Sequence, residues 1–181
     1  MAKGDQGVEW NPHSMDGEEY CLRHLHPRRA EYVVPGKKGC PERRFLVDVS
    51  YGLHCFTRSQ ERGEDVASSR WYSDSRERRV FCMERWRLSY RLPELVETLG
   101  RRKCLHTRGE EFVTLEVVEG GRRFDYAVFF IVSKSSAKGA DLNLFVVSAH
   151  ERFNKLDYTK PVGFHIILMN RYTGKPIKKP R

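Results

Sequence analysis

The chain has 181 residues, of which 39% are hydrophobic and 31% are charged, and its formal net charge is +9. A chain of this length normally forms a single domain around one core. It contains no run of the roughly 18 to 20 apolar residues that a membrane-spanning helix needs, and its first residues lack the apolar segment of a signal peptide. We therefore expect a cytoplasmic protein with no membrane partner, whose five cysteines are reduced thiols.

The beginning of the chain is acidic and has no hydrophobic periodicity. Residues 1–19 have few apolar positions, so we expect them to form a flexible acidic arm outside the fold. Leu22 and Leu25 fit a short helix that Pro27 would end, and residues 32–34 favour an extended chain. A loop is expected after them.

The middle of the chain contains one clear strand and one clear helix. Apolar residues alternate over residues 45–51, which predicts a strand with one buried face. Residues 79–91 fit neither the helical nor the strand period. Leucine and valine then recur at helical spacing over residues 92–99, with Pro93 in the first turn and Gly100 at the end, which predicts a helix.

The C-terminal half is rich in β-forming residues. Four segments favour strands: 112–118, 124–132, 142–148 and 164–169. The glycines of residues 119–122 predict a tight hairpin between the first two. Together these elements predict an α+β fold, an antiparallel β-sheet of about 5–6 strands ending in a meander, with one or two helices packed on one face. The globular domain would cover residues 20–170, and residues 171–181 would form a basic C-terminal tail.

The positive charge is unevenly distributed and is mixed with aromatic residues. Between Arg70 and Lys103 there are ten lysines and arginines against five acids, interleaved with tryptophan, tyrosine and phenylalanine. Cationic groups bind phosphates, and aromatic rings stack on unpaired bases. This pattern predicts a nucleic-acid partner, with RNA favoured over DNA. An acidic protein partner or antitoxin is the alternative, and a solvated surface over ordinary core aromatics is the simplest explanation. The expected nucleic-acid-binding residues are Arg28, Arg29, Arg79, Arg85, Trp86, Arg101, Arg102 and Lys103.

Four histidines are candidate catalytic residues. His24 and His26 precede Arg28 and Arg29 in the sequence. His54 follows the predicted strand, and His150 follows the β-rich segment 142–148. A histidine that accepts the proton of a ribose 2′-hydroxyl, with arginines that neutralise the phosphate, would make a metal-independent ribonuclease of the bacterial toxin or phage-defence type. For each single histidine, a surface or hydrogen-bonded role is the competing interpretation.

Two other chemistries are less favoured. Cys21, His24 and His26, with His54, Cys55, Cys104 and His106, could form a small zinc-binding domain, but they lack the paired spacing of a structural zinc site. No cofactor is therefore expected. Cys55 is a weak candidate nucleophile, because neighbouring residues on a strand point to opposite faces and His54 could not activate it. The phosphate-binding and hydrolase motifs GxxxxGK[ST], GxGxxG, HExxH and GxSxG are absent.

Three stretches resemble a family of small bacterial proteins. They are residues 49–57, with the sequence His-Cys-Phe, residues 79–93, with Arg-Val-Phe and Trp-Arg-Leu-Ser, and residues 144–150. This resemblance implies no particular activity. The order of elements also resembles ribonuclease toxins of the RelE and barnase type, at the level of the fold alone.

Overall fold

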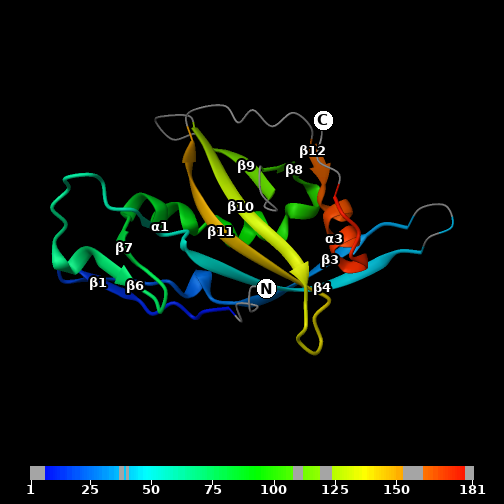
Figure 1. Ribbon diagram of the computed structural model, residues 1–181, viewed down its shortest axis with the longest axis horizontal. Coiled ribbons are helices and arrows are strands. Elements are labelled where there is room, and N and C mark those ends of the chain that lie inside the picture. The colour runs from blue at the N-terminus through cyan, green and yellow to red at the C-terminus, as the bar shows by residue number, and fades with distance from the viewer. Residues whose placement is uncertain are drawn as a thin grey trace.

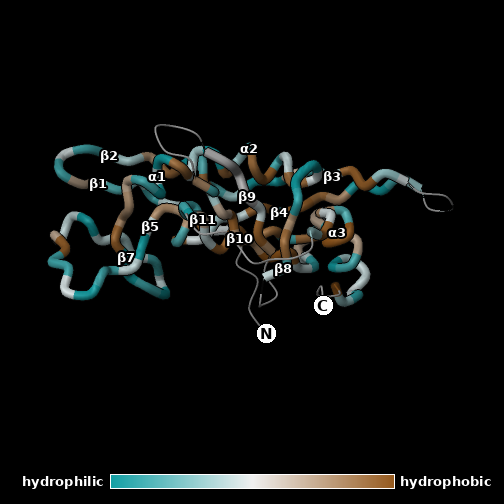
Figure 2. The backbone as a smooth tube through the Cα atoms, turned by 90° about the horizontal axis from the view of Figure 1, so that it is seen from above, coloured by the Kyte–Doolittle hydropathy of each residue, from teal (hydrophilic) through white to brown (hydrophobic). Residues whose placement is uncertain are grey.

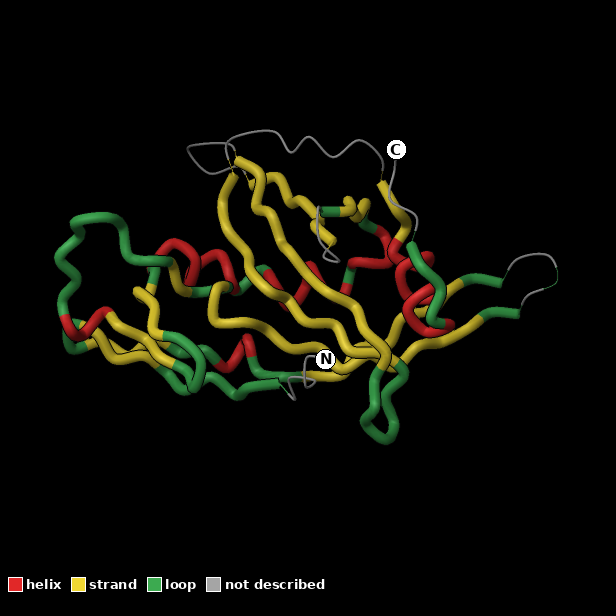
Figure 3. The backbone as a smooth tube through the Cα atoms, in the orientation of Figure 1, coloured by secondary structure: helices red, strands yellow, loops and turns green. Residues whose placement is uncertain are grey.

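The computed structural model describes residues 7–36, 39, 41–107, 112–118, 124–152 and 161–177. In this part of the chain, a curled seven-stranded sheet forms the centre of the molecule, and a three-stranded sheet and a two-stranded hairpin lie at one end (Figure 1). Three α-helices accompany these strands in the described residues, and α3 lies at the other end of the molecule (Figure 3). The predicted α+β class is confirmed.

The predicted sheet had too few strands, and its strands were wrongly predicted to be antiparallel throughout. The main sheet has the strand order β12-β8-β9-β10-β11-β4-β3. Its strands are β3 (Arg28–Val34), β4 (Arg43–His54), β8 (Lys103–His106), β9 (Phe112–Val118), β10 (Phe124–Lys134), β11 (Leu142–Arg152) and β12 (Pro161–Gly163). β4 and β11 are parallel, whereas the other neighbours are antiparallel, so the sheet is mixed.

The remaining elements are short. The small sheet orders β5 (Thr57–Arg58), β7 (Arg78–Phe81) and β6 (Trp71–Ser73), and the hairpin pairs β1 (His13–Met15) with β2 (Glu18–Tyr20). The helices are α1 (Met83–Ser89), α2 (Leu92–Glu97) and α3 (Phe164–Thr173), and the 3-10 turns are η1 (Arg23–Leu25), η2 (Ser68–Arg70) and η3 (Leu99–Arg101). No helix in the described part of the chain is long and apolar enough to cross a bilayer.

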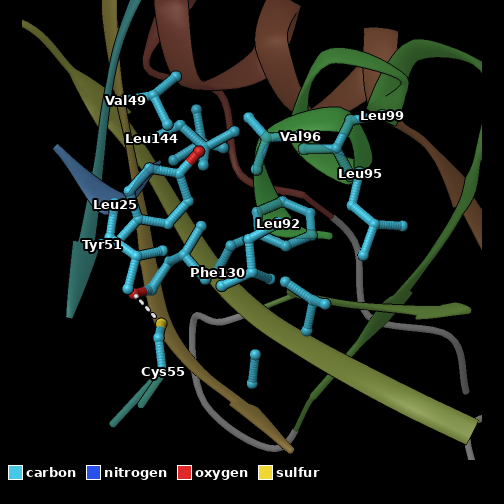
Figure 4. Close-up of a cluster of buried hydrophobic side chains, with 14 of the residues drawn as sticks. Leu25, Val49, Tyr51, Cys55, Leu92, Leu95, Val96, Leu99, Phe130 and Leu144 are labelled. Carbon is cyan, nitrogen blue, oxygen red and sulfur yellow. Dashed lines mark hydrogen bonds between the residues drawn. The ribbon is translucent and has the colours of Figure 1, made fainter. Parts of the chain in front are cut away.

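One face of the main sheet packs against α2 and η3. The face is made by alternating buried residues of β4 and β11, such as Val49, which is paired with Leu144. Leu95, Val96 and Leu99 lie against it. Figure 4 shows these side chains converging from the sheet and the helix, and the hydrophobic segments gather at the same place in Figure 2. The predicted helix at residues 92–99 is thus confirmed, with α2 continued by η3.

The N-terminal segment is part of the fold from residue 7 onward. Trp10 is 3% exposed, and its indole N–H donates to the Tyr51 carbonyl at 3.0 Å. Met15 and Tyr20 are buried in the β1–β2 hairpin, which packs on the aromatic ring of Phe81. The prediction of a flexible arm is therefore wrong for residues 7–19, because a few large rings bury more apolar area than the count of apolar positions indicated. Residues 1–6 lie outside the described residues.

Two other segments differ from the prediction. Residues 164–169 are helical, because Phe164, Ile167 and Leu168 are buried at helical spacing and Gly174 ends the helix with a φ of +70°. The helix also includes the first residues of the predicted tail. Residues 79–91 had no single period because β7 ends at Phe81 and α1 begins at Met83. The predicted hairpin turn at residues 119–122 lies outside the described residues.

Candidate functional site

Two of the candidate histidines lie at the same end of the main sheet. Because β4 and β11 are parallel, their carboxyl ends meet at one edge. His54, the last residue of β4, is paired with Ser148, and His150 follows two residues later on β11. A bulge in β11 after Val146 reverses the alternation, so that Ser148 pairs with Phe129 rather than with the α2-facing Phe130. Paired residues and residues two apart share a face, so both imidazoles lie with Phe129 on the face opposite α2. We call His54, Glu77, Arg79, Arg85 and His150 the strand-end site.

His54 is held by a carboxylate and an arginine from the small sheet. Its Nε2 lies 2.7 Å from Oε1 of Glu77, and the other oxygen of Glu77 accepts a hydrogen bond from Arg79 at 3.3 Å. Arg79 also donates to the hydroxyl of Thr57 at 3.1 Å. The side chains of His54 and Glu77 are 36% and 38% exposed, whereas that of Arg79 is 14% exposed. The pair can therefore be reached from solvent, while its arginine is fixed.

Arg85 fixes the backbone beneath this pair. Its Nη1 donates to the carbonyl of His54 at 3.1 Å and to that of Thr57 at 2.8 Å. Burial lowers the pKa of Arg85 from its usual range, and Arg79 contributes to the same lowering. Among the described residues no carboxylate bonds this guanidinium. A partly buried cation without an acidic partner makes the local potential positive.

His150 is more enclosed than His54. Its ring stacks on Phe129 with 5.4 Å between the centroids and 14° between the planes. Burial, and after it the charges of Arg85 and Arg152, lower its pKa to about 4. His150 is therefore a neutral imidazole at pH 7. Its Nδ1 is buried and has no hydrogen-bond partner among the described residues.

Among the described residues, His24 and His26 make no hydrogen bond with a member of the strand-end site, and each has another partner. His24, in η1, contacts the hydroxyl of Ser89 through Nε2 at 2.6 Å and stacks on Tyr90 with 3.8 Å between the centroids. Burial lowers its pKa to about 4, with a further contribution from His26. His26 contacts the carbonyl of Trp10 at 3.1 Å. The structure thus separates the four candidate histidines into two groups.

Most of the other predicted nucleic-acid-binding residues are paired with groups outside the strand-end site. Arg29 makes a two-point contact with Asp48 at 2.8 and 3.3 Å, and Arg28 is paired with Glu97 at 3.4 Å. The indole N–H of Trp86 donates to the Cys21 carbonyl at 3.0 Å. Arg101 is the last residue of η3, and Arg102 and Lys103 follow it. Arg101 and Lys103 are exposed, and Arg102 donates to the Thr98 hydroxyl at 2.8 Å. Arg79 bonds the carboxylate that contacts His54, and Arg85 bonds the His54 carbonyl.

The cysteines and histidines considered for zinc are dispersed. Cys55 and Cys104 are buried, and burial raises the pKa of each thiol to about 12. Cys21, Cys55, Cys82 and Cys104 are all free thiols. Within the described ranges no three histidine, cysteine, aspartate or glutamate side chains are grouped as metal ligands. The structure therefore adds no support to the zinc hypothesis.

Two members of the site environment, Glu77 and Thr57, were missed by the sequence analysis. Glu77 lies in the turn before β7, where its backbone N–H donates to the side chain of Asp74 at 2.9 Å. Thr57 is buried at the start of β5 and donates to the Leu53 carbonyl at 2.7 Å. Thr57 ends the stretch 49–57 that resembles the bacterial family, but nothing in that stretch singles out its hydroxyl, and Glu77 belongs to no motif. The charged stretch around Glu77 was the one available signal, and it does not single out the glutamate.

The fold and the strand-end site define a mixed-sheet α+β protein with a histidine–glutamate pair beside two arginines. The family model described as the YjaZ family matches residues 12–172, and the chain belongs to this family. It is 30% identical to Protein YjaZ of Escherichia coli (strain K12) over 181 residues, which cover 97% of this chain and 98% of that protein. The expected similarity to a small bacterial family is confirmed, and no solved structure matches the chain.

Proposed function

We propose that this protein binds single-stranded RNA at the strand-end site and cleaves it without a metal ion. The observation that carries the proposal is the half-exposed pair of His54 and Glu77, 2.7 Å apart, with Arg79 on the second oxygen of the carboxylate. A carboxylate that bonds one nitrogen of an imidazole orients the ring and stabilises its protonated form. The other nitrogen can then act as a general base.

RNA fits this chemistry because it carries its own nucleophile. His54 Nδ1 makes no hydrogen bond among the described residues, and it would accept the proton of a ribose 2′-hydroxyl as that oxygen attacks the neighbouring phosphorus. Arg79 would neutralise the charge that develops on the phosphate. The leaving 5′-oxygen would take its proton from water, since His150 is neutral at pH 7.

The positive potential at this end of the sheet supports a phosphate-containing substrate. Arg85 and Arg152 both lower the pKa of His150, which shows that their charges act at this place. The stacked rings of Phe129 and His150 lie on the same face as His54 and offer a surface on which an unpaired base could stack.

The test is cleavage of a labelled single-stranded RNA oligonucleotide by the purified full chain in EDTA. His54→Ala and Glu77→Gln are expected to lower the rate about 100- to 10,000-fold, the range of general base catalysis. His165→Ala removes an imidazole from α3 at the other end of the molecule, and its rate should equal that of the unchanged protein. The all-deoxy oligonucleotide should not be cleaved.

Absence of RNA cleavage by the unchanged protein, or equal cleavage by His54→Ala, would rule the proposal out. Binding that weakens steeply with salt, without cleavage, would instead identify a non-catalytic module for RNA, DNA or an acidic protein partner.

A further inference from the structure

Within the described part of the chain, the β3 edge of the main sheet has no partner strand. β3 is the last strand in the sheet order and pairs with β4 alone. In an antiparallel pair, every second residue of an edge strand directs its N–H and C=O away from its neighbour. Among the described residues, no group outside the sheet bonds the backbone of residues 31–36. This edge therefore offers unpaired donors and acceptors.

A hollow of about 540 Å³ runs along this edge. The six consecutive residues from Glu31 to Gly36 form one wall of the hollow. α3 contributes Phe164, His165 and Leu168 to the lining, and the end of α2 with η3 contributes Glu97, Gly100 and Arg101. At about 3.3 Å per residue, the four of these residues that belong to β3, Glu31 to Val34, span roughly 13 Å. The hollow thus has the shape of a groove with a strand edge on one side and a helix on the other.

The floor of the groove is apolar. Tyr32, Phe164 and Leu168 are 5%, 1% and 1% exposed, and all three line the hollow. The hydroxyl of Tyr32 is already used, since it donates to the Val96 carbonyl at 2.6 Å. An occupant that meets this floor must therefore present an apolar side chain.

The charged groups at the rim do not select a charged occupant. The carboxylate of Glu97 is paired with Arg28, and that of Glu31 is paired with Arg44 at 2.9 Å. Arg101, which is exposed, adds one positive charge to the same rim. The remaining recognition features are the unpaired backbone edge and the apolar floor.

We infer that β3 binds an extended peptide segment of a partner protein as an eighth strand of the sheet. Main-chain hydrogen bonds to the β3 edge supply affinity, and a bulky apolar side chain of the peptide enters the hollow. A single extended peptide occupies only the width of one strand in the groove. A second copy of this chain would bring its own α3 and η3 to the same edge, so the peptide is the better fit.

Gly100 provides a variant that fills the groove without disturbing the fold. A Cβ atom placed at this position meets no atom within 4 Å, and its φ is not positive. Gly100→Trp therefore adds a ring in open space beside the hollow. Ser75→Trp adds the same ring on the exposed turn between β6 and β7, at the other end of the molecule, and serves as its matched control.

The experiment uses a fluorescein-labelled peptide of alternating threonine and phenylalanine with the ¹⁵N-labelled full chain. We expect saturable binding by fluorescence anisotropy, with amide shifts confined to the β3 edge and the groove. The same peptide with every amide N-methylated loses its hydrogen-bond donors and should bind at least about tenfold more weakly, as should the parent peptide to Gly100→Trp. Ser75→Trp should bind the parent peptide like the unchanged chain.

Two results would overturn the inference. One is the absence of shifts at Glu31–Gly36, or equal binding by Gly100→Trp. The other is a dimer in sedimentation that Gly100→Trp abolishes and the peptide does not dissociate, which would assign the edge to a second copy. RNA cleavage by Gly100→Trp should be unchanged, so failure here is distinguishable from failure of the proposed ribonuclease site.

Discussion

Gly52 shows how closely β4 and β11 approach where they run in parallel. A Cβ atom at this position would lie 2.8 Å from the carbonyl oxygen of Val147 and 3.0 Å from the ring of Phe145. Between the pairs Val146–Tyr51 and Ser148–His54, β4 advances three residues and β11 advances two, so the register is irregular at this point. The position of His54 relative to His150 depends on this irregularity.

Replacing Gly52 by alanine should destabilise the protein by about 1–3 kcal/mol, because the added methyl group meets a backbone atom that cannot move independently. Urea unfolding followed by circular dichroism measures the change. Gly100→Ala is the matched control, since it enters open space, and its stability should be unchanged or higher by up to about 1 kcal/mol. Equal stability of Gly52→Ala and the unchanged chain would contradict the close approach.

At this scale the sequence named four members of the strand-end site as candidates and missed Glu77. His54 stood out because it follows a strongly alternating strand, and that strand is confirmed as β4. Glu77 lies 23 residues further along in a polar turn, and only the tertiary fold brings it to the imidazole. His24 and His150 were equally good candidates by residue type. Their burial and their partners, Ser89 and Phe129, distinguish them from His54, and neither is visible in a local pattern.

Among the elements, the loop after β5 is held by one ion pair. The two terminal nitrogens of Arg58, Nη1 and Nη2, each donate to one oxygen of the Glu64 carboxylate. This carboxylate also accepts a hydrogen bond from the backbone N–H of Glu61 at 2.9 Å. These hydrogen bonds lower the pKa of Glu64 to about 2, and those from Arg58 have the largest effect. The loop thus keeps its conformation through charge rather than through buried apolar side chains.

Acid should release this loop. The pKa of Glu64 is lower in the folded chain than its ordinary value of 4.5, so the contact is fully formed above pH 4.5 and is lost as the pH falls toward 2. An NMR titration of the Glu64 carboxyl carbon should show a midpoint well below 4.5, and Arg58→Ala should return it toward 4.5. An ordinary midpoint in the unchanged chain would contradict the ion pair.

The segments whose periodicity was clear were predicted correctly, and those with mixed signals were not. β4, α2, β9, β10 and β11 all coincide with predicted elements. α3 was assigned to a strand because its isoleucines and phenylalanine favour one, although the buried Phe164, Ile167 and Leu168 have helical spacing. The pairing of β4 with β11 carries no local signal, because hydrogen bonding between distant segments leaves no periodic trace in either one.

For the molecule as a whole, two enclosed imidazoles make stability depend on pH. His24 and His150 each have a pKa of about 4 in the folded chain, mainly because burial disfavours the charged form. In the unfolded chain both should titrate near 6.5. Between pH 6.5 and about 4 the unfolded state therefore binds more protons, so the free energy of unfolding should fall as the pH falls through this window.

Urea unfolding at several pH values between 7 and 4 measures this dependence. His150→Gln and His24→Gln should each give a flatter slope of stability against pH, whatever their stability at pH 7. Slopes that are identical in all three proteins would show that the buried histidines do not control the acid response.

The parallel pairing at the centre of the sheet also bears on how the protein is made. On the ribosome, β4 emerges well before β11, and its inner edge has no partner until residues 142–152 have left the exit tunnel. A nascent chain stalled after β10 would expose the alternating apolar face of β4 and an open strand edge. Such a chain should be prone to self-association or should recruit a chaperone, whereas the completed chain closes this edge itself.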